Sequence, residues 1–109
     1  MKPASIAVIT LDGELEIGRK AEIRDTLQMV ESATSVLIDF SDVTYADSTA
    51  LAELMRFHGE ADTRNVSVAL LVGHRRFARL LEYAGLSQAF AVFDSRAAAL
   101  TYLGAPKTT

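Results

Sequence analysis

Three polar residues, Asp47, Ser48 and Thr49, stand directly before a run of apolar residues at helical spacing. Asp, Ser and Thr are favoured at helix N-termini, because their side-chain oxygens accept hydrogen bonds from the first backbone N–H groups of the helix. A hydroxyl at that place also lies where the helix dipole tolerates added negative charge. The pattern suits a phosphorylation site at the start of a helix, although capping alone would also account for these residues.

Ser48 lacks the neighbours that a catalytic nucleophile requires. A nucleophilic serine needs a base within hydrogen-bond reach, and His58 lies ten residues further along the same predicted helix. At 1.5 Å per residue the separation is about 15 Å. His74 could in principle fold near Ser48, but no glycine-flanked nucleophile elbow surrounds this serine. We therefore expect no catalytic residue and no enzymatic activity, and we expect Ser48 to be the substrate of another enzyme.

Three closely spaced carboxylates, those of Asp39, Asp42 and Asp47, could in principle hold a divalent cation. Each, however, stands where Asp commonly bonds to the backbone: the end of a strand, a turn and the start of a helix. We expect no metal site. The interpretation that we favour is an acidic rim around Ser48 that recognises a basic patch on a partner protein.

A basic cluster is formed by His74, Arg75 and Arg76, with Arg79 one turn further on. A solvated helix face, with an ion pair between Arg79 and Glu82, is the simplest interpretation. Cations in a first helical turn are disfavoured by the helix dipole, so binding of an anionic ligand, a nucleotide or an acidic partner is the alternative. The sequence has no glycine-rich phosphate loop, and we expect no cofactor.

The elements that position these residues alternate between strands and helices. Apolar runs predict strands at 6–11, 36–40, 67–72 and 90–93, and an Asp-Gly turn at 12–13 predicts a short strand beginning at 15–17. A second polar turn is expected at 41–42, followed by a short extended piece at 43–45. Helical spacing predicts helices at 19–31, with Ile23, Leu27 and Val30 on one face, at 49–61 and around 77–84. A final helix is expected to start at Asp94-Ser95 and to run through 97–103. Gly85 is expected to end the third helix in a left-handed conformation.

This order predicts an α/β fold: a single compact domain with a mixed, mostly parallel sheet and about four helices. The sheet is expected to be mixed because the opening strands form a hairpin. The domain spans residues 1–109, with an ordered core at about 5–103 and a flexible tail at 104–109.

The composition limits the function classes further. The chain has 109 residues, half of them apolar, but no apolar run as long as the roughly 20 residues of a membrane-spanning helix. A net charge of −3 argues against nucleic-acid binding. Without cysteine there is no disulfide and no thiolate site, and the N-terminus lacks the layout of a signal peptide. We expect a cytoplasmic protein that does not insert into a membrane.

The segment around Ser48 resembles the signature of the STAS domain, the fold of bacterial anti-sigma-factor antagonists. That signature is a hydrophobic strand ending in Asp, followed by D-S-S-G-L or D-S-T-G-L at a helix start. The matching residues, in the order of the chain, are Gly13-Glu14-Leu15-Glu16, with Glu in place of Asp; Asp47-Ser48-Thr49-Ala50-Leu51; Val72-Gly73; Leu80-Leu81-Glu82-Tyr83-Ala84-Gly85-Leu86; and Phe90. The resemblance therefore covers nearly the whole chain.

The resemblance implies an anti-sigma-factor antagonist, which sequesters an anti-sigma factor with serine-kinase activity while Ser48 is unphosphorylated. The kinase would phosphorylate Ser48, a serine phosphatase would reverse this, and Glu16, Asp47, Ser48, Thr49 and Ala50 would bind the partner. Ala50 replaces the usual Gly, and its methyl group is expected to face the approaching kinase. The alternative is a constitutive interaction subunit of a stress-signalling or membrane-transport assembly, without phosphorylation. The oligomeric state stays open.

Overall fold

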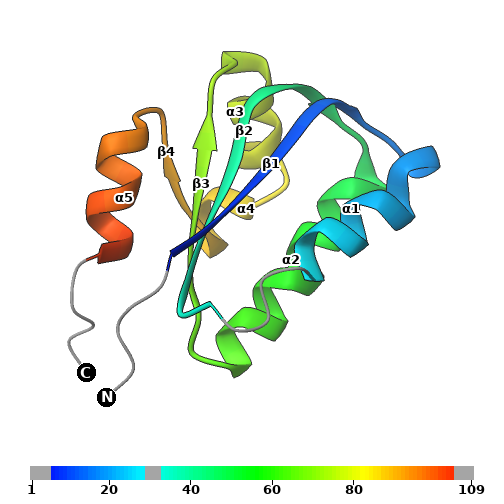
Figure 1. Cartoon of the computed structure of the whole chain (residues 1–109). Helices are drawn as coiled ribbons and strands as arrows, with labels where there is room; N and C mark the ends of the chain where they lie inside the picture. Colours follow the sequence, from blue (N-terminus) through cyan, green and yellow to red (C-terminus); the bar gives the residue numbers. More distant parts are fainter. Residues whose placement is uncertain (1–5, 29–32, 105–109) are drawn as a thin grey trace.

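Four parallel strands in the order β1-β2-β3-β4 form the sheet of this domain (Figure 1). The computed structural model describes residues 6–28 and 33–104. The strands are β1 (Ile6–Leu15), β2 (Ser35–Ala46), β3 (Ser67–Val72) and β4 (Ala91–Phe93). The helices are η1 (Ile17–Arg19), a 3-10 turn, α1 (Lys20–Gln28), α2 (Ser48–Thr63), α3 (Arg75–Tyr83), α4 (Leu86–Ala89) and α5 (Arg96–Gly104). The predicted single α/β domain is confirmed, and no helix in the described ranges is long and apolar enough to cross a membrane.

Helices cover both faces of the sheet. Successive side chains of a strand point to opposite faces, so β2 contributes residues to a core on each side. On β2, Ile38 and Phe40 belong to the larger core cluster, which lies under α1, α2, α3 and α4. Leu37 belongs to a smaller cluster under α5, together with Leu71 and Leu103. Burial on both faces explains why 36–40 is a continuous apolar run in the sequence. Figure 1 shows α5 on the other side of the sheet from α1 and α2.

The expected hairpin at the start of the chain is wrong, and so is the mixed sheet. β1 continues from Ile6 to Leu15 and pairs in parallel with β2, and every pairing among the described strands is parallel. Gly13 has φ +72°, but this left-handed residue lies at an irregularity in the register and does not reverse the chain. An Asp-Gly pair favours a tight turn locally; here the same backbone freedom accommodates a bulge.

The expected turn at 41–42 is also wrong, because β2 continues through it to Ala46. The register of β1 against β2 shifts twice, after Thr10 and after Gly13, and each shift places one more residue on β2 than on β1. Such bulges bend a strand without ending it. The short extended piece predicted at 43–45 is therefore the end of β2 and leads directly into the segment that carries Ser48.

The end of β3 approaches β2 very closely at Gly73. A Cβ atom at this position would lie 2.5 Å from the carbonyl oxygen of Ser41 and 3.0 Å from its Cα. Only glycine fits where two backbones come so close. Gly73 therefore allows the bulged part of β2 to lie against the end of β3.

The helices largely follow their predicted positions. The buried residues of α1 include Ile23 and Leu27, as predicted, while Val30 lies outside the described residues. Gly85 has φ +78°, so its predicted left-handed conformation at the end of α3 is confirmed. The four-residue helix α4 directly follows Gly85 and was not predicted, since one turn is too short to show a helical period. The remaining helices of the described chain include four with nine or more residues.

Candidate functional site

The side chain of Asp47 joins the end of β1 to the start of α2. Its Oδ1 accepts a hydrogen bond from the backbone N–H of Ala50 at 3.0 Å, which makes Asp47 the N-cap of α2. Its Oδ2 accepts a second bond from the backbone N–H of Ile17 at 2.8 Å. The backbone N–H of Asp47 donates to the carbonyl of Leu15 at 2.9 Å. The predicted capping role is confirmed, and the same carboxylate holds the segment after β1 beside the helix.

Ser48 is the first residue of α2, and its side chain is exposed. Because Asp47 supplies the cap, the helix does not depend on the Ser48 hydroxyl, and this hydroxyl has no hydrogen-bond partner among the residues that the structure describes. The hydroxyl of Thr49 belongs to a half-buried residue. Ser48 thus offers the more accessible hydroxyl at the start of α2, with the positive end of the helix dipole beneath it.

Ala50 points into the core and not toward the surface. Its side chain is fully buried in the larger cluster, so the expectation that its methyl group faces an approaching kinase is wrong. The reason is the helical period. Ala50 begins the buried stripe of α2, which continues with Leu54, Phe57 and Ala61. The side chain of Ala50 therefore forms no part of an exposed partner surface.

Glu16 lies beside Asp47, because its two chain neighbours, Leu15 and Ile17, are both hydrogen-bonded to Asp47. The Glu16 side chain is exposed. Ile17 is 69% exposed, so it presents a large apolar side chain to the surface beside these carboxylates. The sequence placed Ile17 in a short strand and gave no sign of its exposure. The structure therefore brings an acidic side chain, an apolar side chain and the Ser48 hydroxyl to one end of α2.

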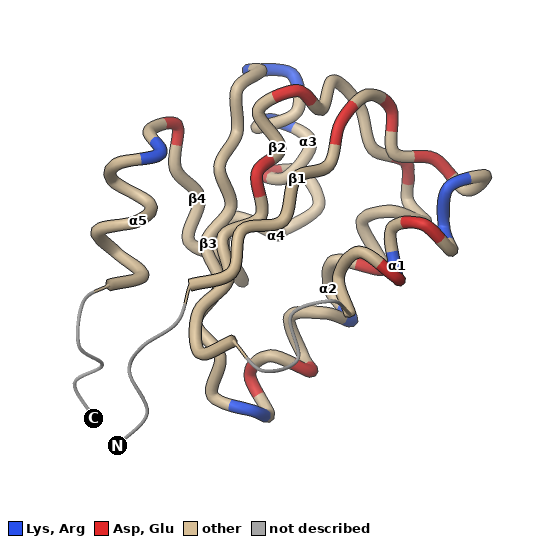
Figure 2. Tube along the Cα trace, viewed as in Figure 1, with Lys and Arg blue, Asp and Glu red and all other residues tan. Residues whose placement is uncertain are grey.

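Arg19 organises the acidic segment between β1 and α1. Its Nη1 donates to the carbonyl oxygens of Asp12 at 2.6 Å and of Glu14 at 2.9 Å. Its Nη2 pairs with the carboxylate of Glu22, and this hydrogen bond lowers the pKa of Glu22. Exposed carboxylates remain at Asp12, Glu14, Glu16 and Asp42. Figure 2 shows the acidic positions along the end of β1 and the segment that leads to α1.

Asp39 does not belong to this acidic rim. Its Oδ2 accepts a hydrogen bond from Nη2 of Arg96 on α5 at 2.6 Å, and its Oδ1 accepts from the backbone N–H of Ser41 at 2.8 Å. Burial raises the pKa of Asp39, but the bonds from Ser41 and the charge of Arg96 outweigh burial and hold the pKa below its ordinary value. Asp39 therefore faces α5, on the other side of the sheet from α2.

In the described part of the chain, Ser48 has neither a metal-ligand group nor His58 within reach. The described residues contain no group of three or more His, Cys, Asp or Glu that could hold a metal ion. The ring of His58 lies edge-on against Phe90, with ring centroids 5.0 Å apart. His58 is ten residues beyond Ser48 on the same helix, so it lies out of reach of the Ser48 hydroxyl.

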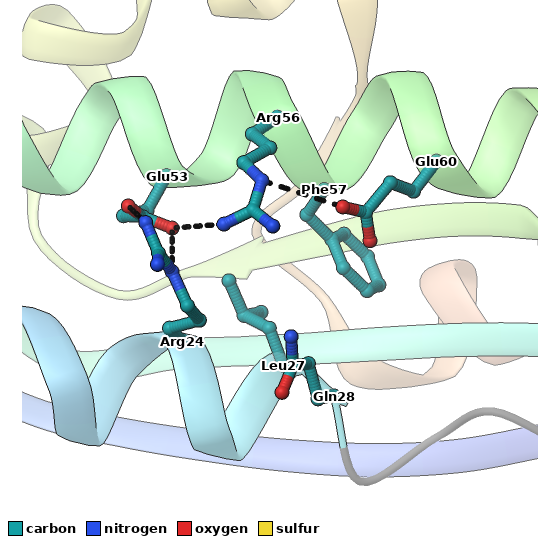
Figure 3. A pocket seen from close by; sticks show the side chains of 7 residues that line it. All are labelled: Arg24, Leu27, Gln28, Glu53, Arg56, Phe57 and Glu60. Carbon is teal, nitrogen blue, oxygen red and sulfur yellow. Dashed lines mark hydrogen bonds and ion pairs between the residues drawn. The ribbon is translucent and has the colours of Figure 1, made fainter.

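A buried carboxylate, Glu53, joins α1 to α2 (Figure 3). Glu53 is 6% exposed and accepts hydrogen bonds from Arg24 at 2.7 and 3.2 Å. Arg56 lies 3.7 Å from the same carboxylate. The hydrogen bonds from Arg24 lower the pKa of Glu53. The hollow between these side chains holds only about 10 Å³, the space of about one water molecule, so we assign this group to the packing of α1 on α2.

The residues of the predicted basic cluster line two adjoining hollows and not a single one. Arg75, Arg76 and Arg79 line one groove of about 470 Å³ together with Leu80 and Tyr83. His74 lines a neighbouring hollow together with Arg75 and Asp94. The expected ion pair between Arg79 and Glu82 is not formed, and within the described ranges none of the three arginines has a carboxylate partner.

Comparisons with known proteins agree on one family. A family model described as the STAS domain matches residues 2–99. A comparison with curated protein sequences found no match.

Solved structures of the same fold come from several bacteria. The chain is similar to an anti-sigma factor antagonist from Mycobacterium paratuberculosis, with 18% identity, a TM-score of 0.84 and coverage of 94% of this chain and 89% of that one. It is similar to a sulfate transporter family protein from Wolinella succinogenes, with 21% identity, a TM-score of 0.76 and coverage of 94% and 88%. It is also similar to the Bacillus cell fate determinant SpoIIAA in its phosphorylated form, with 18% identity, a TM-score of 0.67 and coverage of 94% and 94%.

Proposed function

Since the chain belongs to the STAS domain family, we propose that it is an anti-sigma-factor antagonist that is switched by phosphorylation of Ser48. In the unphosphorylated state it binds an anti-sigma factor that is also a serine kinase. The observation that carries this proposal is that the capping residue of α2 and the exposed hydroxyl are different residues. Asp47 caps the helix, and the exposed hydroxyl of Ser48 has no partner among the described residues. A residue needed only for capping would not be arranged in this way.

The surroundings of Ser48 support a protein partner. Ile17 offers an exposed apolar side chain, and Glu16 and Asp47 offer carboxylates beside it. Apolar contacts with a charged rim are typical of protein interfaces, and the charges steer association. Thr49 adds a half-buried hydroxyl on the next helical position. The partner surface that we propose therefore consists of Glu16, Ile17, Asp47, Ser48 and Thr49.

Phosphorylation of Ser48 would change this surface more than the fold. A phosphate adds roughly −1.5 to −2 charge at neutral pH, and the first turn of α2 can stabilise that charge through its backbone N–H groups. Seen from the partner, a bulky dianion replaces a small hydroxyl beside Glu16 and Asp47. Repulsion, sterics and phosphate desolvation should then weaken binding.

The solved structures of similar fold fit this role. Two of them are described as anti-sigma factor antagonists or cell fate determinants, and one of these is a phosphorylated form. We accordingly expect a serine phosphatase as a further partner, a cytoplasmic location and no activity of the chain as an enzyme.

A constitutive interaction subunit is the second candidate. The similar fold of a sulfate transporter family protein favours this candidate, because it shows that the fold is used outside antagonists. In this case Ser48 would stay unmodified, and the same surface would bind its partner permanently.

The deciding experiment uses a serine kinase that co-purifies with this chain, with ATP. Wild type, Ser48→Ala, Ser48→Asp and Thr49→Ala are incubated with the kinase, the phosphosite is mapped by mass spectrometry, and affinity is measured before and after. We expect modification of wild type and Thr49→Ala at Ser48, and no modification of Ser48→Ala. Phosphorylation should cost about 2 to 4 kcal/mol of binding, or roughly 30- to 1,000-fold in affinity. Modification elsewhere, or equal affinity of both forms, would favour the constitutive subunit.

A further inference from the structure

We propose that the exposed face of α3 that carries Arg75, Arg76, Arg79 and Tyr83 is a second docking surface, which binds an acidic segment of a protein partner. This basic face is separate from the surface around Ser48, and the inference does not depend on phosphorylation. Figure 2 shows its basic positions at the start of α3, beyond the end of β3, away from the acidic segment that leads to α1.

The arginines of the basic face are not used within the domain. They line a groove of about 470 Å³ whose lining includes no carboxylate. Arg75 also lines the adjoining hollow, which contains Asp94, but forms no ion pair with it. Among the described residues none of them forms an ion pair or a hydrogen bond. In contrast, Arg19 and Arg24 both form ion pairs with carboxylates. Guanidinium groups held together without a counter-charge repel one another, and a bound anion would remove this repulsion.

The start of α3 adds to the need for an anion. Arg75 and Arg76 lie in the first helical turn, which contains no acidic residue, and the N-cap residue His74 makes no side-chain hydrogen bond to that turn. The helix dipole disfavours cations at this end. The first backbone N–H groups therefore lack a side-chain acceptor. A carboxylate from a partner can satisfy these groups and neutralise the arginines at once.

Tyr83 makes the basic face a surface for a protein. Tyr83 is 87% exposed and lies two turns from Arg76 on the same groove, with the half-buried Leu80 between them. Tyrosine and arginine are enriched at the centres of protein interfaces, where they contribute much of the binding energy. The occupant that we infer is an acidic segment with one apolar or aromatic residue, which packs against Tyr83 and Leu80.

The size and surroundings of the basic face favour a short peptide over a nucleic acid. The nine residues of α3 extend over about 13 Å, which accommodates about four extended residues. Nucleic-acid binding needs a row of cations along the phosphate backbone. The three arginines of the basic face lie within one nine-residue helix, so they provide no such row.

The test measures binding of a fluorescein-labelled nine-residue peptide that has Glu and Asp around a central Leu-Phe pair. Its controls are the same peptide with Gln and Asn in place of the acids, and a nine-nucleotide oligo-dT. We expect the acidic peptide to bind the full chain with a Kd below about 100 μM at low salt. Binding should weaken as salt is added, because exposed charges are screened.

Variants decide whether the basic face is responsible. Arg76→Gln, Arg79→Gln and Tyr83→Ala should each weaken binding of the acidic peptide at least about fivefold. Lys20→Gln removes one exposed positive charge on α1 and should leave binding unchanged. All four side chains are exposed, and unchanged melting temperatures will show that the variants are folded.

Several results would overturn the proposal. These are no binding of the acidic peptide up to 1 mM, equal binding of the Gln/Asn peptide, equal losses in Lys20→Gln, or tighter binding of oligo-dT. Sedimentation of the free chain adds a last test: self-association that disappears in Arg79→Gln would assign the basic face to a second copy of the chain.

Discussion

Replacement of Gly73 by alanine should destabilise the domain strongly, although the change adds a single methyl group. The new Cβ would lie 2.5 Å from the carbonyl oxygen of Ser41, 3.0 Å from its Cα and 3.1 Å from its carbonyl carbon. Favourable contacts between heavy atoms begin at roughly 3.5 Å, so β2 and β3 must separate by about 0.5 to 1 Å. The three nearest atoms belong to the backbone of Ser41 on β2, which cannot rotate away as a flexible side chain can.

The expected cost is about 2 to 3 kcal/mol, at the upper end of the range for overpacking. For a domain of this size, 1 kcal/mol corresponds to about 4 °C in melting temperature. Gly73→Ala should therefore lower the melting temperature by about 8 to 12 °C. The variant should still fold, since domains of this size have about 5 to 15 kcal/mol of stability.

Gly59→Ala is the matched control. Gly59 lies inside α2, and an added Cβ would have no atom within 4 Å. Alanine is the better helix former by about 0.5 to 1 kcal/mol, so this variant should be slightly more stable than wild type.

Urea and thermal unfolding followed by circular dichroism would measure both variants. The reasoning would be refuted if Gly73→Ala melted within 2 °C of wild type while Gly59→Ala rose as expected. A fall in both variants would point to a general intolerance of alanine and not to the contact with Ser41.

Three further predictions concern single residues. Gly85→Val should lower the melting temperature by destabilising the domain by about 1 to 2 kcal/mol, because a β-branched residue is strained at φ +78°; an unchanged melting temperature would contradict this. Asp47→Ala should lower the free energy of unfolding of the domain by about 1 to 3 kcal/mol, because the Asp47 side chain accepts two backbone hydrogen bonds. The control Asp42→Ala changes an exposed residue and should alter stability by less than about 0.5 kcal/mol. A charge reversal at Glu16 tests partner steering without disturbing the cap, and Glu16→Lys should slow association with the anti-sigma factor and change its salt dependence; equal rates would remove Glu16 from the interface.

The fifth prediction concerns acid. The pKa of Asp39 is lower in the folded chain than in the unfolded chain, so the unfolded chain binds the proton more readily in the intervening pH range. The stability from Asp39 is complete above its ordinary pKa and is lost as the pH falls through the lower folded value. Asp39→Asn should therefore lose less stability than wild type between about pH 5 and pH 2, as measured by urea unfolding. An identical acid profile would show that Asp39 is not responsible.

Elements with local signals can be predicted from the sequence alone. The strand at 67–72 was predicted with the bounds of β3, and α2 was predicted within two residues at each end. Asp47 was recognised as a capping residue, and Gly85 as a left-handed one. Helical period, capping and positive φ each depend on only a few neighbouring residues, so the sequence contains enough information to show them.

Contacts between residues far apart in the chain depend on the packing of the whole domain. The pairs Asp39–Arg96 and Arg24–Glu53 join residues that are 57 and 29 positions apart, and no local pattern matches them. Because Asp39 binds Arg96 on α5, it lies outside the acidic rim that the sequence predicts. Such pairs depend on which helix covers which face of the sheet, and that choice follows from the packing of the whole domain.

The register of the sheet likewise could not be predicted from the sequence. Whether Gly13 reverses the chain or accommodates a bulge depends on the strand that β1 meets, and here β1 meets β2 in parallel over its whole length. The same pairing brings the end of β1 to Asp47, and with it the exposed Ile17 to Ser48. A strand shows which of its residues are apolar, but its partner decides where the strand ends and which side chains remain exposed.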